Sequence, residues 1–169
     1  MDLLASYAWG RFYPARNEIV RILRRLGDAH PTVRWTHVEG IAVVHSCLDN
    51  REVIRRCRDL LRRGEESFEF AVKWIPVDYW CATDLGAMKH VIDEEACARI
   101  QPGETWAMRV HKRRWQTYHT AEIVACLAAG IDRKVDLKHP DKILWVDVLG
   151  DSTAISVLEP PDIFSVTLS

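Results

Sequence analysis

The chain has 169 residues, with 23 Lys and Arg against 24 Asp and Glu, so its formal net charge is −1. Hydrophobic residues make up 48% of it, an ordinary share for a globular protein that buries a core. This balance excludes attraction of a polyanion by the total charge, and any such site must come from local clusters of basic residues. The length fits one large domain or two small ones.

The cysteines and the apolar runs indicate the cellular compartment. The 5 cysteines are an odd number without close spacing, which favours reduced thiols over a disulfide framework. Cys57 and Cys126 lie in apolar helical patterns, where a cysteine is usually a core residue. No apolar run reaches the roughly 18 residues that a membrane span needs, and residues 1–7 do not resemble a cleaved leader. We therefore expect a soluble cytoplasmic protein without membrane contact.

The beginning of the chain carries the signals of three strands and one helix. An apolar run over 3–8 predicts a strand, and Pro14 opens a pattern with apolar residues three and four positions apart. Gly27 ends this helix, as glycine often does just past a helix terminus. Strands over 33–38 and 41–45 are predicted to meet at a Glu-Gly turn.

A second helix and a fourth strand complete this half. Asp49 precedes the helix and Glu52 follows three residues later, the spacing of a capping box. Residues 68–74 alternate between hydrophobic and other side chains, which predicts a strand that Pro76 stops or bends at an edge. The order βαββαβ predicts a ferredoxin-like domain over 1–78, with two helices on one face of an antiparallel sheet.

The remaining residues, 79–169, follow the different order α-β-α-β-β. Thr83 is predicted to cap a helix whose apolar residues continue to Ile100, and Thr120 starts the next helix. The predicted strands are 105–111, 143–149, 153–158 and a short last strand within 163–168. The whole chain is thus predicted to be an α+β protein of two domains that pack together, with a boundary near residue 78.

Basic residues gather in two segments of this second half. The first segment, at the end of the strand over 105–111, contains Arg109, Lys112, Arg113 and Arg114. The second segment precedes the next strand and contains Arg133, Lys134, Lys138, His139 and Lys142, with three Asp among them. If the two segments lie together, they form a positive patch that suits phosphate contacts. The alternative is that both are solvated turns.

Two further features have both a binding and a structural interpretation. The side chains that could stack on bases are His111, Trp115, Tyr118 and His139. Trp115 could instead close the end of a helix. The second helix, within 51–63, has Arg51, Arg55, Arg58 and Arg62 on one face. That face is either an ordinary exposed surface or a second contact for RNA or protein.

The sequence offers no catalytic constellation. It has no C-x-x-C or H-x-x-x-H spacing, and Cys81, His90 and Cys97 are too scattered for a zinc site. It has neither a phosphate-binding P-loop nor a G-x-G-x-x-G fingerprint, and no serine or cysteine stands in a nucleophile elbow. We therefore expect a non-catalytic protein without metal or cofactor.

The second basic segment resembles a known motif. The run over 134–141, KVDLKHPD, resembles the K-V-D-L-x-N-P motif of THUMP domains, with His139 where the family usually has asparagine. The strand over 105–111, with the basic residues after it, is similar to the family's strand that ends in a basic pair. Ferredoxin-like domains commonly precede THUMP domains. The resemblance therefore implies a ferredoxin-like domain over 1–78 and a THUMP domain over 79–169.

The resemblance also implies tRNA binding, at the acceptor stem and its single-stranded CCA end. Most relatives continue into a catalytic domain, for which this chain leaves no room. The architecture resembles the stand-alone adaptor that assists a separate acetyltransferase in forming N4-acetylcytidine in tRNA. The alternatives are the recognition subunit of a split tRNA thiolation or methylation enzyme, and a ligand-sensing ferredoxin-like regulator.

The resemblance and the charge pattern together assign roles to the basic residues. Arg113 is expected to hold an acceptor-stem or CCA phosphate through a bidentate pair. The other expected RNA contacts are Arg109, Lys112, Arg114, Lys134, Lys138 and His139. The central prediction is that the two basic segments converge in space.

The uncharged residues of the motif and its aspartate receive structural roles. Asp136 is expected to cap a turn, with a contact to a base edge as the alternative. Val135, Leu137 and Pro140 are expected to pack and to shape the loop.

Overall fold

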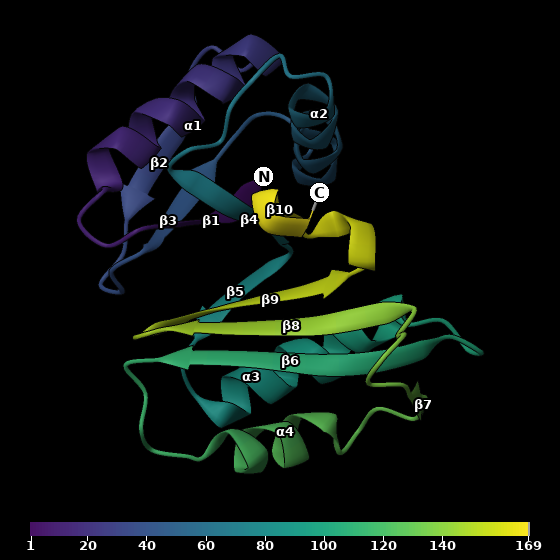
Figure 1. Cartoon of the computed structure of the whole chain (residues 1–169). Coiled ribbons are helices and arrows are strands. Elements are labelled where there is room, and N and C mark those ends of the chain that lie inside the picture. Colours follow the sequence, from purple (N-terminus) through teal and green to yellow (C-terminus); the bar gives the residue numbers. More distant parts are fainter. Residues whose placement is uncertain (169) are drawn as a thin grey trace. The chain divides into compact units, whose positions relative to one another are not determined.

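The computed structural model describes residues 1–168, the last of them by its backbone alone. The chain divides into two compact units, one formed by Met1–Val77 with the residues from Pro161 onward and the other by Asp78–Pro160. Within the described residues, each unit combines one five-stranded sheet with helices on it (Figure 1). The protein is thus α+β, as predicted.

The first unit has the predicted ferredoxin-like order. Its elements are β1 (Asp2–Tyr7), α1 (Phe12–Leu26), β2 (Thr32–Trp35), β3 (Ile41–His45), α2 (Asn50–Arg62), β4 (Ala71–Val77) and β10 (Phe164–Ser165). The sheet order is β10-β4-β1-β3-β2, and every neighbouring pair is antiparallel. The prediction of a βαββαβ domain is therefore confirmed.

The two helices of this unit are amphipathic, and their apolar stripes form its core. Ile19 and Leu23 of α1 and Ile54 and Cys57 of α2 are buried against strand residues such as Trp74. Their spacing of three or four positions puts the apolar side chains of each helix on the face toward the sheet. Burial raises the pKa of the Cys57 thiol to about 12, so this cysteine is a core residue, as predicted.

The helix ends follow local rules that the sequence shows. Gly27 has φ 114°, and its N–H donates to the carbonyl of Arg24. The carboxylate of Asp49 accepts from the N–H of Glu52 at 2.9 Å, the expected N-cap contact of α2. Helix α1 begins at Phe12, two residues before Pro14. Proline has no backbone N–H, but the N–H groups of a first helical turn have no intrahelical partner, so Pro14 fits there without loss of a hydrogen bond.

Two strands of the first unit differ from their predicted bounds. The predicted strand from residue 68 begins only at Ala71, because the carboxylate of Glu18 takes the N–H groups of Glu69, Phe70 and Ala71. Pro76 does not stop β4, which pairs with β1 as far as Val77. Strand β2 ends at Trp35 rather than at residue 38, so the turn is a longer connection over 36–40.

The second unit has a mixed sheet in the order β5-β9-β8-β6-β7. Its elements are β5 (Tyr79–Ala82), α3 (Leu85–Val91), β6 (Thr105–Arg113), α4 (Thr120–Ala128), β7 (Lys134–Val135), β8 (Lys142–Leu149) and β9 (Ser152–Leu158). β6 is parallel to both β7 and β8, and the other pairs are antiparallel. Helices α3 and α4 pack through Met88 and Leu127 on Leu144 and Val146 of the sheet.

Several details of this unit were not predicted. The short strands β5 and β7 lie in segments that were expected to be connections. Asp84, rather than Thr83, caps α3 by accepting from the N–H of Ala87, while the Thr83 hydroxyl bonds with that of Thr153. Helix α3 continues into a π turn and a 3-10 turn that end at Arg99.

The last strand belongs to the first unit, whereas the predicted division put residues 161–168 in the second domain. β10 is only two residues long and pairs with Trp74 and Lys73 of β4. Phe164 is buried in the first core, where its ring centroid lies 4.9 Å from that of Phe68. Burial of this one aromatic ring explains why the chain returns to the first sheet.

Candidate nucleic-acid interface

Strand β6 puts Arg109 and Arg113 of the first basic segment on one face of its sheet. Met108 and Val110 pack against the core under α3 and α4. Successive side chains of a strand point to opposite faces, so Arg109, His111 and Arg113 lie on the face without helices. Sequence alternation along this strand therefore produces a row of basic side chains.

Within this row, Arg113 forms an ion pair with an acidic residue of β8. Its guanidinium forms an ion pair with Asp147, and the two side chains are 35% and 5% exposed. The indole N–H of Trp145 donates to the other oxygen of the same carboxylate at 3.3 Å. The ring of His111 lies 4.6 Å from that of Trp145. Arg113 thus has a structural partner, which the prediction of a phosphate contact did not include.

Arg109 connects the strand to the second basic segment. Its Nη2 donates to the carbonyl of Leu137 at 2.7 Å, and its Nη1 donates to the carbonyl of Met108 at 3.2 Å. This side chain fixes the loop between β7 and β8 against β6. The two basic segments are therefore joined by a direct contact.

The loop after β7 is shaped by Asp136. Its Oδ1 accepts from the N–H groups of Lys138 at 3.1 Å and His139 at 3.0 Å. The bond from His139, more than any other contact, holds the pKa of Asp136 below its ordinary value. The structure thus confirms the predicted turn.

The apolar residues of the motif divide into one buried and two exposed. Pro140 is buried, as expected of a residue that shapes the loop. Val135 and Leu137 are 54% and 65% exposed, so the prediction that they pack is wrong. Because the turn at Asp136 and the bond from Arg109 already define the loop, these side chains are left at the surface between Lys134 and Lys138. Lys134, Lys138 and His139 are exposed beside them.

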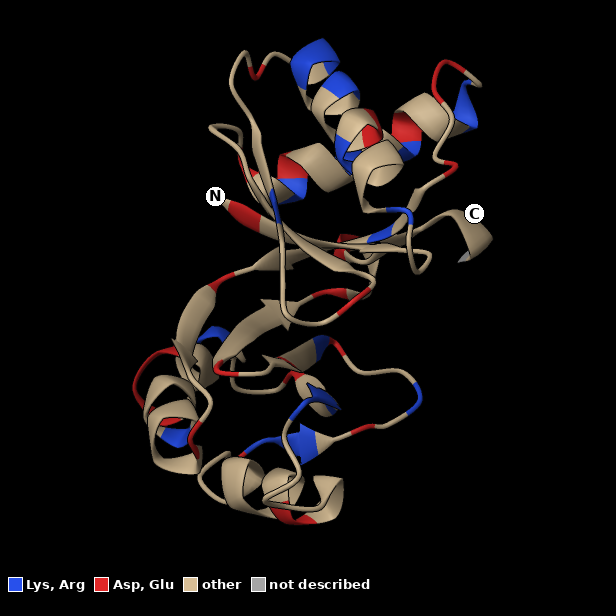
Figure 2. Cartoon of the chain, turned by 90° about the vertical axis from the view of Figure 1, so that its left-hand side faces the viewer, with Lys and Arg blue, Asp and Glu red and all other residues tan. Residues whose placement is uncertain are grey.

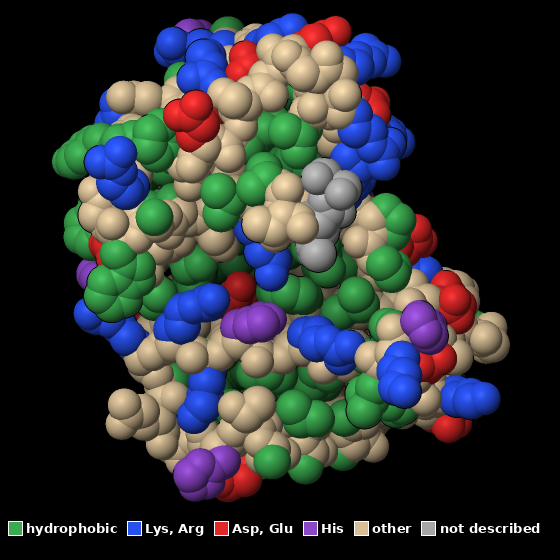
Figure 3. All heavy atoms as spheres, in the orientation of Figure 1, with side chains coloured by type: hydrophobic (Ala, Val, Ile, Leu, Met, Phe, Trp, Pro, Cys, Tyr) green, Lys and Arg blue, Asp and Glu red, His purple; other side chains and the backbone are tan. Residues whose placement is uncertain are grey.

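The two basic segments do not converge at one point. Lys134 pairs with Thr105 at the beginning of β6, and Arg113 is the last residue of that strand. Eight residues of extended chain separate Thr105 from Arg113, which is roughly 26 Å. The basic residues form a row instead, which we call the β6 row: Arg109, His111, Arg113, Arg114, Lys134, Lys138 and His139. Figure 3 shows Lys, Arg and His side chains spread in a line over the surface of the second unit.

Lys112 and Arg114 stand on either side of Arg113 at the end of β6, where Lys and Arg are blue in Figure 2. Lys112 points to the opposite face of the sheet from Arg113. Lys112 donates from Nζ to the carbonyl of Tyr118 at 2.7 Å. Arg114 is exposed and has φ 58°, the one positive φ at a non-glycine among the described residues. A left-handed conformation costs an L-residue about 1 kcal/mol or more. Glycine would adopt this conformation at no steric cost.

Other cations of the second segment have internal partners. Lys142 donates to Glu104 at 2.6 Å, and this contact is the largest cause that raises its pKa. Arg133 donates from Nε to the carbonyl of Ile100 at 3.1 Å. These two residues therefore support the unit rather than the exposed part of the row.

Three of the four aromatic candidates for stacking, His111, Trp115 and Tyr118, are partly buried. Trp115 and Tyr118 pack against the core of the second unit, with their ring centroids 5.5 Å apart. This supports the structural interpretation of Trp115. His139 remains exposed in the loop.

The arginine face of α2 holds the C-terminal segment of the first unit. Arg58 donates to the carbonyls of Pro161 at 2.6 Å and Ile163 at 3.1 Å, and Arg51 pairs with Asp162 at 3.4 Å. Arg55 pairs with Glu52 one turn away. At least part of this basic face is thus structural.

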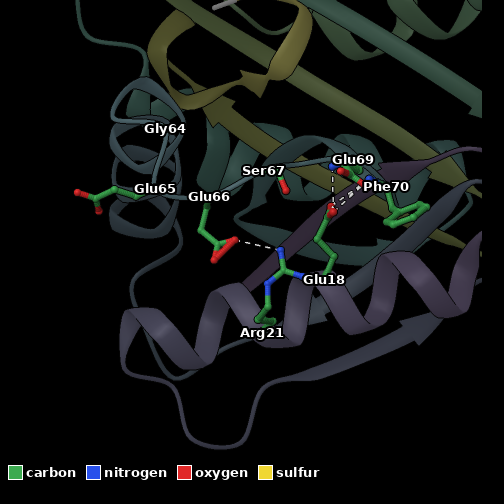
Figure 4. A pocket seen from close by; sticks show the side chains of 8 residues that line it. All are labelled: Glu18, Arg21, Gly64, Glu65, Glu66, Ser67, Glu69 and Phe70. Carbon is green, nitrogen blue, oxygen red and sulfur yellow. Dashed lines mark hydrogen bonds and ion pairs between the residues drawn. The ribbon is translucent and has the colours of Figure 1, made fainter.

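One cavity of the first unit is acidic. It has about 550 Å³ and is lined by Glu18, Arg21, Gly64, Glu65, Glu66, Ser67, Glu69 and Phe70 (Figure 4). Glu66 pairs with Arg21 at 3.0 Å, and the Glu18 carboxylate is taken by backbone N–H groups. Such a lining does not suit a phosphate.

Within residues 1–168, no three His, Cys, Asp or Glu side chains are placed to hold a metal ion. Over the same residues, no helix has the length and hydropathy that crossing a bilayer requires.

Comparison with known proteins shows the fold. No family model matches the sequence, and no curated protein matches it significantly. Three solved structures resemble it at 14% identity: PH1313 from Pyrococcus horikoshii, TrmN from Thermus thermophilus and a 4-thiouridine synthetase in complex with RNA and ATP. Their TM-scores are 0.66, 0.61 and 0.54, over 97, 95 and 97% of this chain.

The chain matches 55, 46 and 41% of the length of those three proteins. It therefore spans about half of each. The chain has an α+β fold that these larger proteins also contain.

Proposed function

We propose that this chain is a THUMP-type module that binds the acceptor end of tRNA and presents the tRNA to a separate modification enzyme. The observation that carries the proposal is the β6 row, a line of cations on a protein whose formal net charge is −1. A linear row suits the regular spacing of phosphates along a nucleic-acid strand better than it suits a small anion. The fold shared with a synthetase solved with RNA supports the same class of ligand.

The residues of the row have two different roles in this proposal. Arg114, Lys134, Lys138 and His139 are exposed and make the direct phosphate contacts. Arg109 and Arg113 position them, because their guanidinium groups hold the loop carbonyl of Leu137 and the carboxylate of Asp147. Val135 and Leu137 lie against riboses or base faces next to the phosphates.

The chemistry of modification belongs to another chain in this proposal. The residues of the row are Lys, Arg and two histidines, without a nucleophile–base pair or a cofactor loop among them. We propose an acetyltransferase that forms N4-acetylcytidine as the enzyme served, on the strength of the KVDLKHPD string. The fold shared with a 4-thiouridine synthetase favours a thiolation enzyme as the second candidate.

The proposal is tested with total tRNA and the purified full chain. We expect a gel shift that weakens when the CCA end is removed and that weakens as salt is raised. Lys134→Ala/Lys138→Ala should weaken it, whereas Lys73→Ala, in the first unit, is the matched control. A shift that is insensitive to salt and to the double substitution would remove the β6 row from the site. Nucleoside analysis of tRNA from a deletion strain then identifies the modification that is lost.

A further inference from the structure

The first unit exposes three large aromatic side chains outside the β6 row. Trp9, Tyr13 and Trp35 are 80%, 69% and 66% exposed. Trp9 lies in the connection after β1, Tyr13 in the first turn of α1 and Trp35 at the end of β2. Rings of this size contribute most to stability when they are buried, so three exposed ones indicate a surface that meets a partner.

These three side chains lie at the same end of the first sheet. β1 and β2 are both antiparallel to β3 and therefore run in the same direction, so their final residues are at one end. Trp35 pairs with Ala42, which packs with Ala15 of α1, so Trp35 lies on the helix-bearing face. A Cβ atom on Gly40 would be 3.4 Å from the ring of Trp9, which places that ring over the β2–β3 connection.

Cations accompany the rings at this end. The guanidinium of Arg16 lies 5.9 Å from the centroid of Tyr13, and that of Arg11 lies 5.3 Å from the centroid of Phe70. The ring of His37 lies 5.9 Å from that of Trp35. Figure 3 shows hydrophobic, basic and histidine side chains together at the left edge of the upper unit, where Figure 1 places the start of α1.

The backbone adds to the positive character of this end. α1 is a helix of 15 residues with no acidic residue in its first turn, so its N-terminal N–H groups and dipole are not neutralised there. The nearby Glu39 accepts a hydrogen bond from the N–H of Gly10 at 2.8 Å. We call the surface of Trp9, Arg11, Tyr13, Arg16, Trp35 and His37 the aromatic end.

We infer that the aromatic end binds unpaired nucleotides of RNA, by stacking bases on Trp9, Tyr13 and Trp35 and by placing Arg11 and Arg16 on the flanking phosphates. Exposed aromatic rings interleaved with cations are the composition of single-strand binding surfaces. A duplex hides its base faces, so this surface selects unpaired segments. The inference goes beyond the proposed function, because it concerns the other unit and a ligand read through bases rather than through phosphates alone.

The test uses the full chain and an unstructured octanucleotide, A8 RNA, with a duplex of the same length as the matched ligand. Stacking on an indole quenches its fluorescence, so we expect A8 to quench tryptophan emission and the duplex to quench it less. Trp9→Ala and Trp35→Ala should each lower the affinity for A8 by about tenfold, while Trp35→Phe should keep most of it. Trp80→Ala, in the second unit, is the control for loss of a partly exposed tryptophan.

The outcomes separate this inference from the proposed function. Lys134→Ala/Lys138→Ala should weaken tRNA binding and leave the quenching by A8 unchanged. Absence of A8 binding by the wild-type chain, or equal affinity of the tryptophan variants and the wild type, would overturn the inference. Loss of a bound protein by the tryptophan variants, with A8 affinity unchanged, would also overturn it and assign the surface to a protein partner. Because the replaced side chains are exposed, thermal unfolding should show that the variants remain folded.

Discussion

The clearest separation of structural and binding roles in the β6 row comes from Arg113→Ala. The substitution leaves the carboxylate of Asp147, which is 5% exposed, without its cationic partner. Removing one member of a buried ion pair costs about 3–5 kcal/mol. Because the Arg113 side chain is 35% exposed, water screens part of the pair. We therefore expect the free energy of unfolding to fall by about 2 kcal/mol.

The assay is urea denaturation followed by circular dichroism, with a double-mutant cycle that includes Asp147→Asn. The asparagine keeps an acceptor for the indole of Trp145, which donates to Asp147 at 3.3 Å, but removes the charge. The double variant should therefore be more stable than Arg113→Ala alone. Arg113→Lys should restore part of the stability by restoring the charge. Unchanged stability of Arg113→Ala, with a loss of tRNA affinity and of salt dependence, would refute the structural role and assign Arg113 to a phosphate.

Three further predictions concern single residues. Glu18→Ala should lower the free energy of unfolding, measured by urea denaturation, by about 3–5 kcal/mol, because three backbone N–H groups lose their hydrogen-bond acceptor. Glu18→Gln should lower it less, because the amide oxygen can still accept. Asp136→Asn should retain tRNA affinity in a filter-binding assay, because asparagine can still accept hydrogen bonds from the N–H groups of Lys138 and His139. Asp136→Ala should weaken the affinity, because alanine cannot accept them. An equal loss of affinity in both variants would favour a contact of the carboxylate with RNA. Arg114→Gly should leave the melting temperature of the chain unchanged, because glycine tolerates φ 58°. It should lower the slope of log K for tRNA binding against log salt by about 1, the contribution of one phosphate contact. A large drop in melting temperature would contradict this.

Much of the fold could be predicted because its signals are local. The N-cap at Asp49 and the left-handed Gly27 each depend on residues within one turn of a helix. The turn at Asp136 needs only the next three residues, and it was predicted for that reason.

The remaining features depend on long-range register. The pair of Arg113 with Asp147 joins residues 34 positions apart, and it exists because His111 and Asp147 face each other in parallel strands. The register of β7 against β6 puts Lys134 beside Thr105 and so far from Arg113. A short last strand was predicted within 163–168, but its pairing with the first sheet was not, because two strand residues carry no signal of which sheet they join.

The salt dependence of tRNA binding tests the central claim most directly. The apparent association constant should be measured from about 50 to 200 mM salt for the wild type and for Lys134→Ala/Lys138→Ala. If the β6 row holds phosphates, the double variant should reduce the slope of log K against log salt by about 2, with a matching loss of affinity. The same slope in both proteins would contradict the account.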